Sequence, residues 1–476
     1  MSSSSKEYKY KELGDCIELV IDHRGKTPKK LGSDWVKNGI PTISAKNVNS
    51  GKLVAQDKIR FVTQDIYEKW MKEDVKPGDC FLVSEGATLG ECLYWDNDYP
   101  VVLGQRIFCI RTNPEILYPR YFYAYMTSNA FQSEVIGRAT GSSVPGLRQT
   151  EVLKLNVKVL PMEDQIFIGD LLYNINKKVQ KNTETNQTLE QIAQAIFKSW
   201  FVDFEPSRAK IAAKKRWQAI NEVTETSSPT CYAEELDSSN QNTNLRNQSL
   251  DDTMTQAAMS AISGKSVQEL EQLTPEQQQQ LKETAALFPD VLVESELGEA
   301  PEGWGHDVVG DLFELHRGFD LPKKDRKEGD YPVFAAGGFH GNNAYFKMEP
   351  PGIITGRSGV IGNVYLSLEK YWPLNTTLYV REFKKCGPYF AYFFLSSIDL
   401  KSLNSGSAVP SLNRNFVHSL PCVVPGEALL ESFEKNMKPL FAKIKANDSE
   451  VELLSSIRDG IFPKLLSGKL TLNSAA

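Results

Sequence analysis

Two long stretches of the chain place apolar residues at alternating steps of four and three, the pattern of a helix with one buried stripe. The first stretch spans 168–200 and the second spans 433–465. Both keep the alternation without a slip, which is typical of a coiled-coil seam. Each stripe covers 33 residues, or roughly 50 Å of helix. We predict two long helices paired through these stripes. The alternative, two amphipathic helices packed on separate cores, stays open here.

The two predicted seams match position by position at an offset of 265 residues. Asn182 and Asn447 share one repeat position, where a buried Asn lowers stability but fixes register. Pro439 and Pro463 should each kink the second helix or end it at the preceding turn, so we expect a break near its start. The first seam consists of Ile168, Leu172, Ile175, Val179, Asn182, Asn186, Leu189, Ala193, Ile196 and Trp200, and the second of Phe433, Met437, Leu440, Ile444, Asn447, Val451, Leu454, Arg458, Ile461 and Leu465.

The repeat extends upstream of the two helices. Residues 140–147 (TGSSVPGL) match residues 405–412 (SGSAVPSL) at the same offset of 265. Fainter matches lie further upstream, at offsets that drift as loops of different length would cause. They pair 14–19 with 310–315, 40–45 with 331–336, and 82–90 with 354–362. The order is therefore globular unit, long helix, insertion, globular unit, long helix.

The globular units have a mixed α/β (α+β) pattern. Short β-rich runs bounded by Gly, Pro or Asn predict strands of about five residues. Two aromatic segments, 118–126 and 387–395, predict helices that begin at a proline. Their aromatic side chains fit a core better than a base-stacking platform. The predicted strand runs are FLVSEG, VVLGQRIFCIR, GIITGRSG and TTLYVREF.

The insertion between the units carries most of the acidity. Residues 218–300 hold 3 Lys and Arg against 15 Asp and Glu, a net charge of −12. The rest of the chain holds 51 against 45, a net +6, which permits DNA binding without demonstrating it. The insertion begins with a polar stretch that we expect to be flexible. Capping boxes at 266–269 and 274–277 then predict two short helices.

The chain divides into five predicted segments. Two are globular units, two are helical regions, and one is the acidic insertion. Their predicted bounds are 1–160 for the first globular unit, 161–206 for the central helical region, 207–300 for the insertion, 301–425 for the second globular unit, and 426–476 for the C-terminal helical region.

The sequence shows no catalytic or metal-binding signature. Its seven cysteines include no CxxC pair, and its five histidines show no HxxxH or HxH spacing. Met259 replaces the first Gly of a phosphate loop. The tetrapeptide 349–352 (EPPG) has Glu and Gly where an adenine-methylating pocket needs Asp or Asn and an aromatic residue. We predict a non-catalytic chain without a metal. It has no apolar run near the ~18 residues of a spanning helix, and no secretory signal, so we expect a cytoplasmic protein.

Two globular units, each followed by a matched heptad helix, resemble the specificity (S) subunit of type I restriction–modification systems. Local segments resemble the family too. They resemble the segment that ends the family's central helix, the segments that precede its second recognition domain, and the segment near its C-terminus. These segments are 197–210, 258–265, 286–290, 295–298, 301–304 and 462–469.

The resemblance implies that each globular unit is a target recognition domain reading one half of a split double-stranded DNA sequence. It implies that the long helices pair antiparallel and set the half-site spacing. Two modification subunits, which bind S-adenosylmethionine and methylate adenine, would dock on the helical regions. Restriction subunits that use ATP and Mg would join them. The two units differ in sequence, so the full target should be non-palindromic.

Contacts with DNA need Lys or Arg for phosphates, and Arg, Lys, Asn, Gln or Ser for base edges. The same residues would otherwise be ordinary solvent-facing polar groups. The predicted contacts are Arg24, Lys26, Lys29, Lys46, Asn47, Gln105, Arg106 and Arg148 in the first unit, and Arg317, Lys323, Lys324, Arg357, Ser358, Asn375 and Arg414 in the second.

Three other functions remain open on the sequence alone. The chain could serve a related system in which one partner chain both methylates and cleaves. It could be a coiled-coil scaffold that reads no sequence. It could also be an enzyme that acts alone. Methylation by the isolated chain would favour the last function, and a discrete bipartite DNA footprint would exclude the scaffold.

Overall fold

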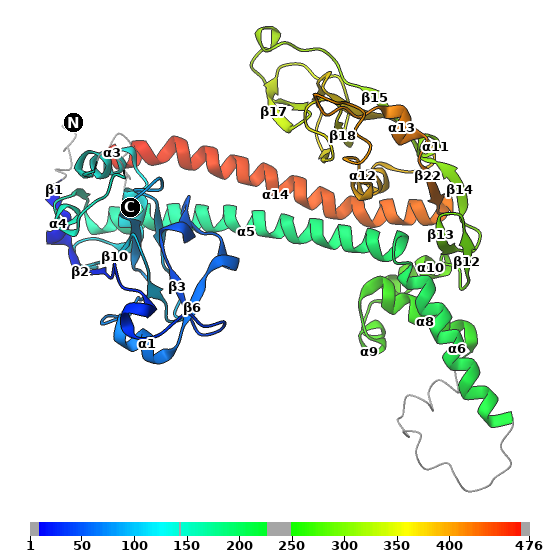
Figure 1. Ribbon diagram of the computed structural model, residues 1–476, viewed down its shortest axis with the longest axis horizontal. Coiled ribbons are helices and arrows are strands. Elements are labelled where there is room, and N and C mark those ends of the chain that lie inside the picture. The colour runs from blue at the N-terminus through cyan, green and yellow to red at the C-terminus, as the bar shows by residue number, and fades with distance from the viewer. Residues whose placement is uncertain (1–8, 142–143, 226–248, 468–476) are drawn as a thin grey trace, which may run out of the picture. The chain divides into compact units, whose positions relative to one another are not determined.

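The computed structural model describes residues 9–141, 144–225 and 249–467 (Figure 1). The chain divides into two compact units. Unit 1 comprises residues 1–183 and 449–476, and unit 2 comprises residues 184–448. Each unit therefore joins one globular part to a segment of both long helices.

Unit 1 is built on a four-stranded antiparallel sheet with the order β2-β10-β7-β8. A three-stranded sheet has the order β6-β3-β9, and its strands are interspersed in sequence with those of the four-stranded sheet. Strand β3 runs antiparallel to β6 and parallel to β9. Two smaller pairs are β1-β11 and β4-β5. The strands are β1 Lys9–Glu12, β2 Ile17–Asp22, β3 Ile40–Ile43, β4 Val48–Asn49, β5 Lys52–Leu53, β6 Arg60–Val62, β7 Cys80–Val83, β8 Cys92–Tyr94, β9 Val102–Leu103, β10 Ile107–Thr112 and β11 Asn156–Val159; the helices are α1 Gln64–Trp70, α2 Pro119–Met126, α3 Asn129–Arg138 and α4 Gln149–Leu153.

Unit 2 repeats this topology. Its four-stranded sheet has the order β15-β21-β18-β19, and its three-stranded sheet has the order β17-β16-β20 with the same antiparallel and parallel pairings. The pair β14-β22 matches β1-β11, and a hairpin β12-β13 precedes it. The strands are β12 Leu292–Ser295, β13 Gly298–Pro301, β14 Gly305–Val308, β15 Phe313–Arg317, β16 Tyr331–Ala335, β17 Gly338–Asn343, β18 Gly352–Gly356, β19 Val364–Ser367, β20 Trp372–Pro373, β21 Thr377–Phe383 and β22 Pro421–Val424; the helices are α11 Val309–Leu312, α12 Pro388–Ser397 and α13 Arg414–His418.

The predicted mixed fold and internal repeat are therefore confirmed. The four predicted strand runs contain β7, β10, β18 and β21. The two aromatic helices begin at Pro119 and Pro388, where proline lacks only an N–H that has no helical acceptor. Most of their aromatic side chains are buried, including Tyr121 and Phe390. The prediction that these rings form core is correct.

Two long helices, α5 (Met162–Phe201) and α14 (Glu427–Ser467), contribute a segment to each unit. In unit 1 Asn176 accepts a hydrogen bond from Arg458 (3.2 Å), and Asn182 donates to Glu450 (2.8 Å). Their partners follow in opposite order along the chain, so the segments are antiparallel.

Unit 2 shows the same direction. Asn447 donates to Asn186 (2.7 Å), and the Trp200 and Phe433 rings lie 5.9 Å apart. Every residue of the two predicted seams is buried or half-buried. The predicted antiparallel coiled coil is confirmed, and the alternative of two separate amphipathic helices is wrong.

The expected break in the second long helix is absent, because α14 is continuous through Pro439 and Pro463. Both prolines are exposed, so the carbonyl group that each leaves unpaired can be solvated. The neighbouring Met437 and Phe441 are buried in the core of unit 2. Packing of this helix face outweighs the lost backbone hydrogen bond.

The insertion forms a helical layer within unit 2. Its two predicted short helices are confirmed as α9 (Val267–Glu271) and α10 (Pro275–Ala286), each with the predicted capping box. Two further helices, α6 (Glu205–Glu225) and α8 (Leu250–Ser263), were not predicted. The expected flexible stretch falls largely on residues 226–248, outside the described residues.

Candidate nucleic-acid interface

Four loops of unit 1 meet at one edge of the four-stranded sheet. Because neighbouring strands are antiparallel, β2 and β7 end at the edge where β10 begins. The side chain of Gln105 joins two of the loops: it accepts from the Gly25 N–H (3.2 Å) and donates to the Lys26 carbonyl (2.7 Å). The turn before Leu147 reaches the same edge, because the Leu147 N–H donates to the Ser84 carbonyl (2.7 Å). Residues distant in sequence thus form one surface.

Unit 2 builds the corresponding edge with the same backbone hydrogen bonds. The Leu412 N–H donates to the Arg357 carbonyl (2.8 Å), as Leu147 does to Ser84. The Arg357 guanidinium donates to the Asn375 carbonyl (3.3 Å), and the Asn375 side chain donates to Asp320. Arg357 and Asn375, two of the predicted DNA contacts of unit 2, therefore lie together at one sheet edge.

The predicted contacts differ in exposure. Lys26 and Arg24 are half-buried, as are several residues of unit 2 at the loop bases. The exposed ones are Lys29, Lys46, Gln105, Arg106, Arg148, Arg317, Lys323 and Lys324, and the half-buried ones in unit 2 are Arg357, Ser358, Asn375 and Arg414.

Asn47 is fully buried and does not belong to the surface. Its side-chain oxygen accepts from the Ser44 N–H and hydroxyl (3.2 and 3.0 Å). Its amide donates to the carbonyls of Val54 and Ala55, both at 3.4 Å. The residue holds a short turn together, so its prediction as a DNA contact is wrong. Asn has the same capping chemistry in turns as it has toward a base, and the sequence does not separate the two.

Arg24 is partly committed to the protein. Two of its nitrogens donate to Asp22 (2.9 and 2.8 Å), and a third donates to the Leu147 carbonyl (3.0 Å). Its guanidinium also lies 4.2 Å from the Phe108 ring centroid. This arginine links the loop after β2 to the turn before Leu147. It therefore helps to position these loops and also contributes positive charge.

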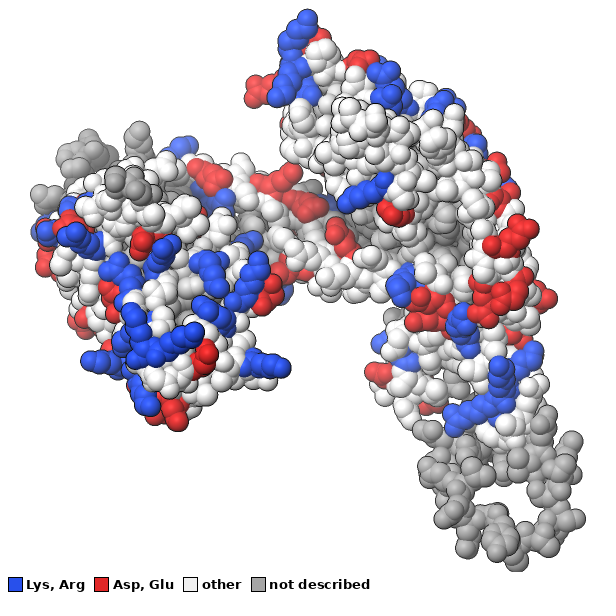
Figure 2. Space-filling view, in the orientation of Figure 1, with Lys and Arg blue, Asp and Glu red and all other residues white. Residues whose placement is uncertain are grey.

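The surface of unit 1 is more basic than the prediction required. Figure 2 shows Lys and Arg side chains gathered on the face that carries α1, β3 and β6. Residues 23–79 hold 12 Lys and Arg against 7 Asp and Glu, a net charge of +5. Exposed cations that we had not predicted include Lys52, Lys58, Arg60 and Lys72. The local charge excess was visible in the sequence and could have found them.

Two basic groups near this edge have lowered pKa values. Burial lowers the pKa of Lys26, and the positive charge of Lys72 lowers it further. Burial likewise lowers the pKa of His23, with Lys26 adding to the effect. An anion placed here would relieve this mutual repulsion, which favours phosphate binding.

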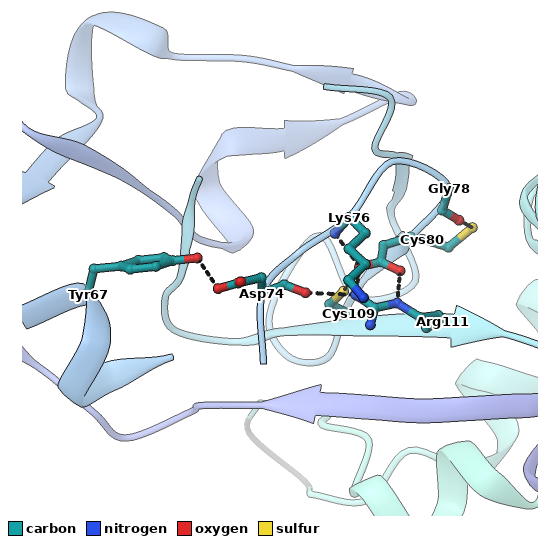
Figure 3. A network of polar contacts seen from close by, with 8 residues as sticks. Tyr67, Asp74, Lys76, Gly78, Cys80, Cys109 and Arg111 are labelled. Atoms are coloured by element: carbon teal, nitrogen blue, oxygen red, sulfur yellow. Dashed lines mark hydrogen bonds and ion pairs between the residues drawn. The ribbon is translucent and has the colours of Figure 1, made fainter. Parts of the chain in front are cut away.

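A buried ion pair holds the segment after α1 against the sheet (Figure 3). Arg111 donates two hydrogen bonds of 2.8 Å to the Asp79 carboxylate and one of 2.7 Å to the Asp74 carbonyl. The side chains of Arg111 and Asp79 are only 13% and 1% exposed. Tyr67 of α1 donates to the Asp74 carboxylate. The network fixes α1 beside the basic loops.

Within the described residues, no group of three or more His, Cys, Asp or Glu side chains could hold a metal ion. No described helix is long and apolar enough to span a membrane.

Two topologically matched α+β units, each with polar and cationic loops at one sheet edge, define a duplicated nucleic-acid-binding protein. The model of the family "Type I restriction modification DNA specificity domain" matches residues 5–191 and 301–427. The chain belongs to this family and is a DNA sequence-recognition protein.

Individual proteins agree with this assignment. The chain is 28% identical over 444 residues to the type I restriction enzyme HindI specificity subunit of Haemophilus influenzae, covering 84% of this chain and 88% of the relative. It is 20% identical over 504 residues to the MjaIX specificity subunit of Methanocaldococcus jannaschii, covering 98% and 94%. The crystal structure of the type I restriction–modification S subunit from M. genitalium has the same fold, with a TM-score of 0.59, 14% identity and 97% coverage of both chains.

Proposed function

We propose that each unit reads one half of a bipartite, asymmetric DNA target. The observation that carries this proposal is the combination of one repeated topology with two different loop edges. Because the two units share one topology, each can present its loop edge to DNA in the same way. Because the side chains on the two edges differ, each edge can recognise a different base sequence. The exposed cations supply phosphate contacts, and the half-buried polar residues at the loop bases are candidates for base contacts.

We further propose that α5 and α14 set the spacing between the half-sites. Each helix has about 40 residues and is therefore about 60 Å long. One turn of DNA is about 34–36 Å, so a helical pair of this length is long enough to separate two half-sites. The polar seam supports a fixed register, because Asn186 and Asn447 bond only in the correct alignment.

The partners are part of the same proposal. Two modification subunits would bind on the helical regions and carry S-adenosylmethionine and the methylating pocket. Restriction subunits would add ATP- and Mg-dependent cleavage, and the complex would act in the cytoplasm. The chain itself would be non-catalytic, a role supported by the missing methylation tetrapeptide.

Methylome sequencing of a host that carries the system is the decisive experiment. We expect one non-palindromic motif with two short specified parts and a fixed gap. A palindromic or continuous motif would contradict the proposal. Replacing the loop edge of unit 2 should change only one half of the motif.

Binding to the target should fall steeply with salt, because several phosphates are neutralised. A shallow salt slope would contradict phosphate binding by the exposed cations. Incubation of the isolated chain with DNA and S-adenosylmethionine should transfer no methyl group, and robust transfer would contradict the non-catalytic role.

A further inference from the structure

Unit 1 contains a cavity of about 620 Å³ between its basic loops, its three-stranded sheet and α1. This volume lies within the range of about 300–1,000 Å³ that is typical of small-molecule sites. Its walls come from the segments that follow β2 and β3, from the loops between β7 and β8 and between β9 and β10, from Arg60 of β6, and from the end of α1. Of these segments, α1 is held by the Asp79–Arg111 network through the hydrogen bond of Tyr67 to Asp74.

Two buried side chains lining the cavity have polar atoms without a hydrogen-bond partner among the described residues. They are the indole N–H of Trp70, which is 1% exposed, and the hydroxyl of Thr42, which is 7% exposed. Buried polar groups in folded proteins are nearly always hydrogen-bonded, because leaving one unpaired costs about 1–3 kcal/mol. Both atoms have the chemistry to bond a ligand that fills the cavity.

The cavity also combines positive charge with aromatic surface. Lys26, Lys46, Arg60 and Arg106 line it, against a single carboxylate, that of Glu85. Glu85 forms an ion pair with Arg106 (3.7 Å), so one carboxylate faces four cations and the lining keeps an excess of positive charge.

Trp35 supplies the aromatic surface, because the neighbouring Trp70 side chain is almost fully buried. The Arg60 guanidinium lies 3.9 Å from the Trp35 ring centroid, and the Trp35 and Trp70 rings are 6.4 Å apart. Arginine and indole faces together suit a planar ring that carries an anionic group.

The backbone at the rim is strained in a way that the fold does not require. Arg106 has a φ of +62°, in the left-handed region that costs a non-glycine residue roughly 1 kcal/mol or more. At the corresponding place before β21, Thr376 has a negative φ. Such strain is concentrated at functional sites.

The repeat shows that the polar lining is specific to unit 1. In β3, Thr42 pairs with Val102, and in the matching strand β16, Val333 pairs with Trp372. The buried hydroxyl therefore corresponds to an apolar valine. Between β17 and β18, unit 2 has no helix to match α1, the source of Trp70.

We propose that this cavity receives one nucleotide, with its base against the Trp35 ring and its phosphate near the lysine and arginine side chains. The nucleotide could be a free mononucleotide or one extruded from bound DNA. The DNA source rests on the proposed function, whereas the free-nucleotide source does not.

The full-length chain should be titrated with each of the four deoxynucleoside monophosphates, and binding should be followed by tryptophan fluorescence and by the heat of binding in a calorimeter. Thr42→Val and Trp70→Phe each remove one polar atom, and Thr42→Val does so with almost no change in side-chain shape. We expect each to weaken binding about tenfold, the effect of losing a hydrogen bond to a charged ligand. Thr112→Val and Trp95→Phe are matched controls, because they remove buried atoms that are also unpartnered but lie outside the cavity lining. The controls should bind like the wild type.

The second arm uses the chain with its modification subunits and target duplexes carrying 2-aminopurine at successive positions. A fluorescence increase at one position of the first half-site, lost in Thr42→Val, would identify extruded DNA as the source. Mononucleotide binding that depends on Thr42 and Trp70, without such an increase, would identify the free nucleotide.

Three results would overturn the proposal. One is no response in either arm while the complex still binds its target sequence. Another is equal weakening by the cavity variants and the controls. The third is binding of inorganic phosphate as tight as that of the nucleotides, because the indole surface would then have no role. Loss of all sequence-specific DNA binding would instead count against the proposed function and would leave the mononucleotide arm interpretable.

Discussion

The two units share a topology but not a surface. Between β2 and β7, unit 1 inserts residues 23–79, with a helix and a net charge of +5. Between β15 and β18, unit 2 inserts only residues 318–351, which hold 5 Lys and Arg against 5 Asp and Glu. This shorter segment exposes Phe339 (65%) and Tyr345 (56%). The comparison teaches that duplication preserved the sheets, while the connections diverged in length, charge and aromatic content.

The junction with the long helices differs in a similar way. In unit 1 Gly169 of α5 lies so close to α2 that an added Cβ would stand 2.5 Å from the Tyr121 nitrogen. Glu434 occupies the matching position of α14, and its carboxylate accepts from the Phe390 N–H of α12 (2.8 Å). Burial raises the pKa of Glu434. One unit allows close backbone approach, and the other caps a helix with a carboxylate.

The largest expected effect is a loss of stability on breaking the ion pair of unit 1, compared with breaking the corresponding ion pair of unit 2. Asp79→Asn would leave the nearly buried Arg111 without its charge partner, so we expect unit 1 to lose about 3 kcal/mol of stability. Arg381 holds the corresponding position of β21 but pairs with Glu314 near the surface, with 48% of its side chain exposed. Glu314→Gln should therefore have little effect, because solvent screens that pair. Chemical denaturation of the full chain measures both, and equal shifts would contradict the distinction.

A second difference lies in the helix seam. Asn186→Leu would leave buried Asn447 without its acceptor, so we expect a loss of about 2 kcal/mol in unit 2. Asn182→Leu in unit 1 should cost less, because its partner Glu450 keeps an ion pair with Lys178 (3.2 Å). Thermal unfolding of the two variants tests the order. A larger loss for Asn182→Leu would reverse our interpretation of the seam.

DNA binding should separate the two edges. Arg357→Ala should weaken binding to the second half-site about tenfold, as expected for one base-reading arginine, and should leave the first half-site nearly unchanged. Arg106→Ala is the parallel change in unit 1, at the start of β10 rather than at the end of the strand that corresponds to β18. Competition with duplexes altered in one half-site, using the complex with modification subunits, measures each effect. Equal loss at both half-sites would remove Arg357 from the base-reading residues.

The smallest expected effect is a pH dependence of unit 2. The ring nitrogen Nε2 of His418 accepts from the Leu315 N–H (2.9 Å), so the neutral ring is required. Burial lowers the pKa of His418, Arg414 and Lys384 add to this, and Glu314 opposes it. A histidine with a lowered folded-state pKa contributes stability above its unfolded pKa of about 6.5, and that contribution is lost as pH falls through the folded value.

We therefore expect acidification from pH 7.5 to 5.5 to remove roughly 1 kcal/mol, the contribution of one hydrogen bond. His418→Gln should flatten this part of the profile. The difference between wild type and variant cancels the carboxylates of the unit whose pKa values burial raises, such as Glu434 and Asp448. A profile unchanged by the substitution would exclude His418 as the cause.

The hydrophobic periodicity and the helix-start signals of the sequence were sufficient to predict the long helices, several short helices and the duplication. Alternating steps of four and three identified α5 and α14, because one buried stripe imposes that spacing on a helix. Prolines and capping boxes located the starts of α2, α9, α10 and α12, since these are local hydrogen-bond effects. The repeat predicted the duplication. Pro439 was the local signal that misled, because packing of α14 on the core outweighed it.

Only the tertiary structure decided which polar residues form the surface. Asn47 and Gln105 are equally plausible base contacts in the sequence, yet one is fully buried and the other lies on a loop edge. Thr42 and Trp70 could likewise not be identified from the sequence, because only the tertiary structure shows that their polar atoms are unpaired and that both residues line a cavity. Short-range patterns reflect interactions within a helix or turn. Burial and hydrogen-bond satisfaction depend instead on contacts between segments far apart in the chain, and no local pattern records them.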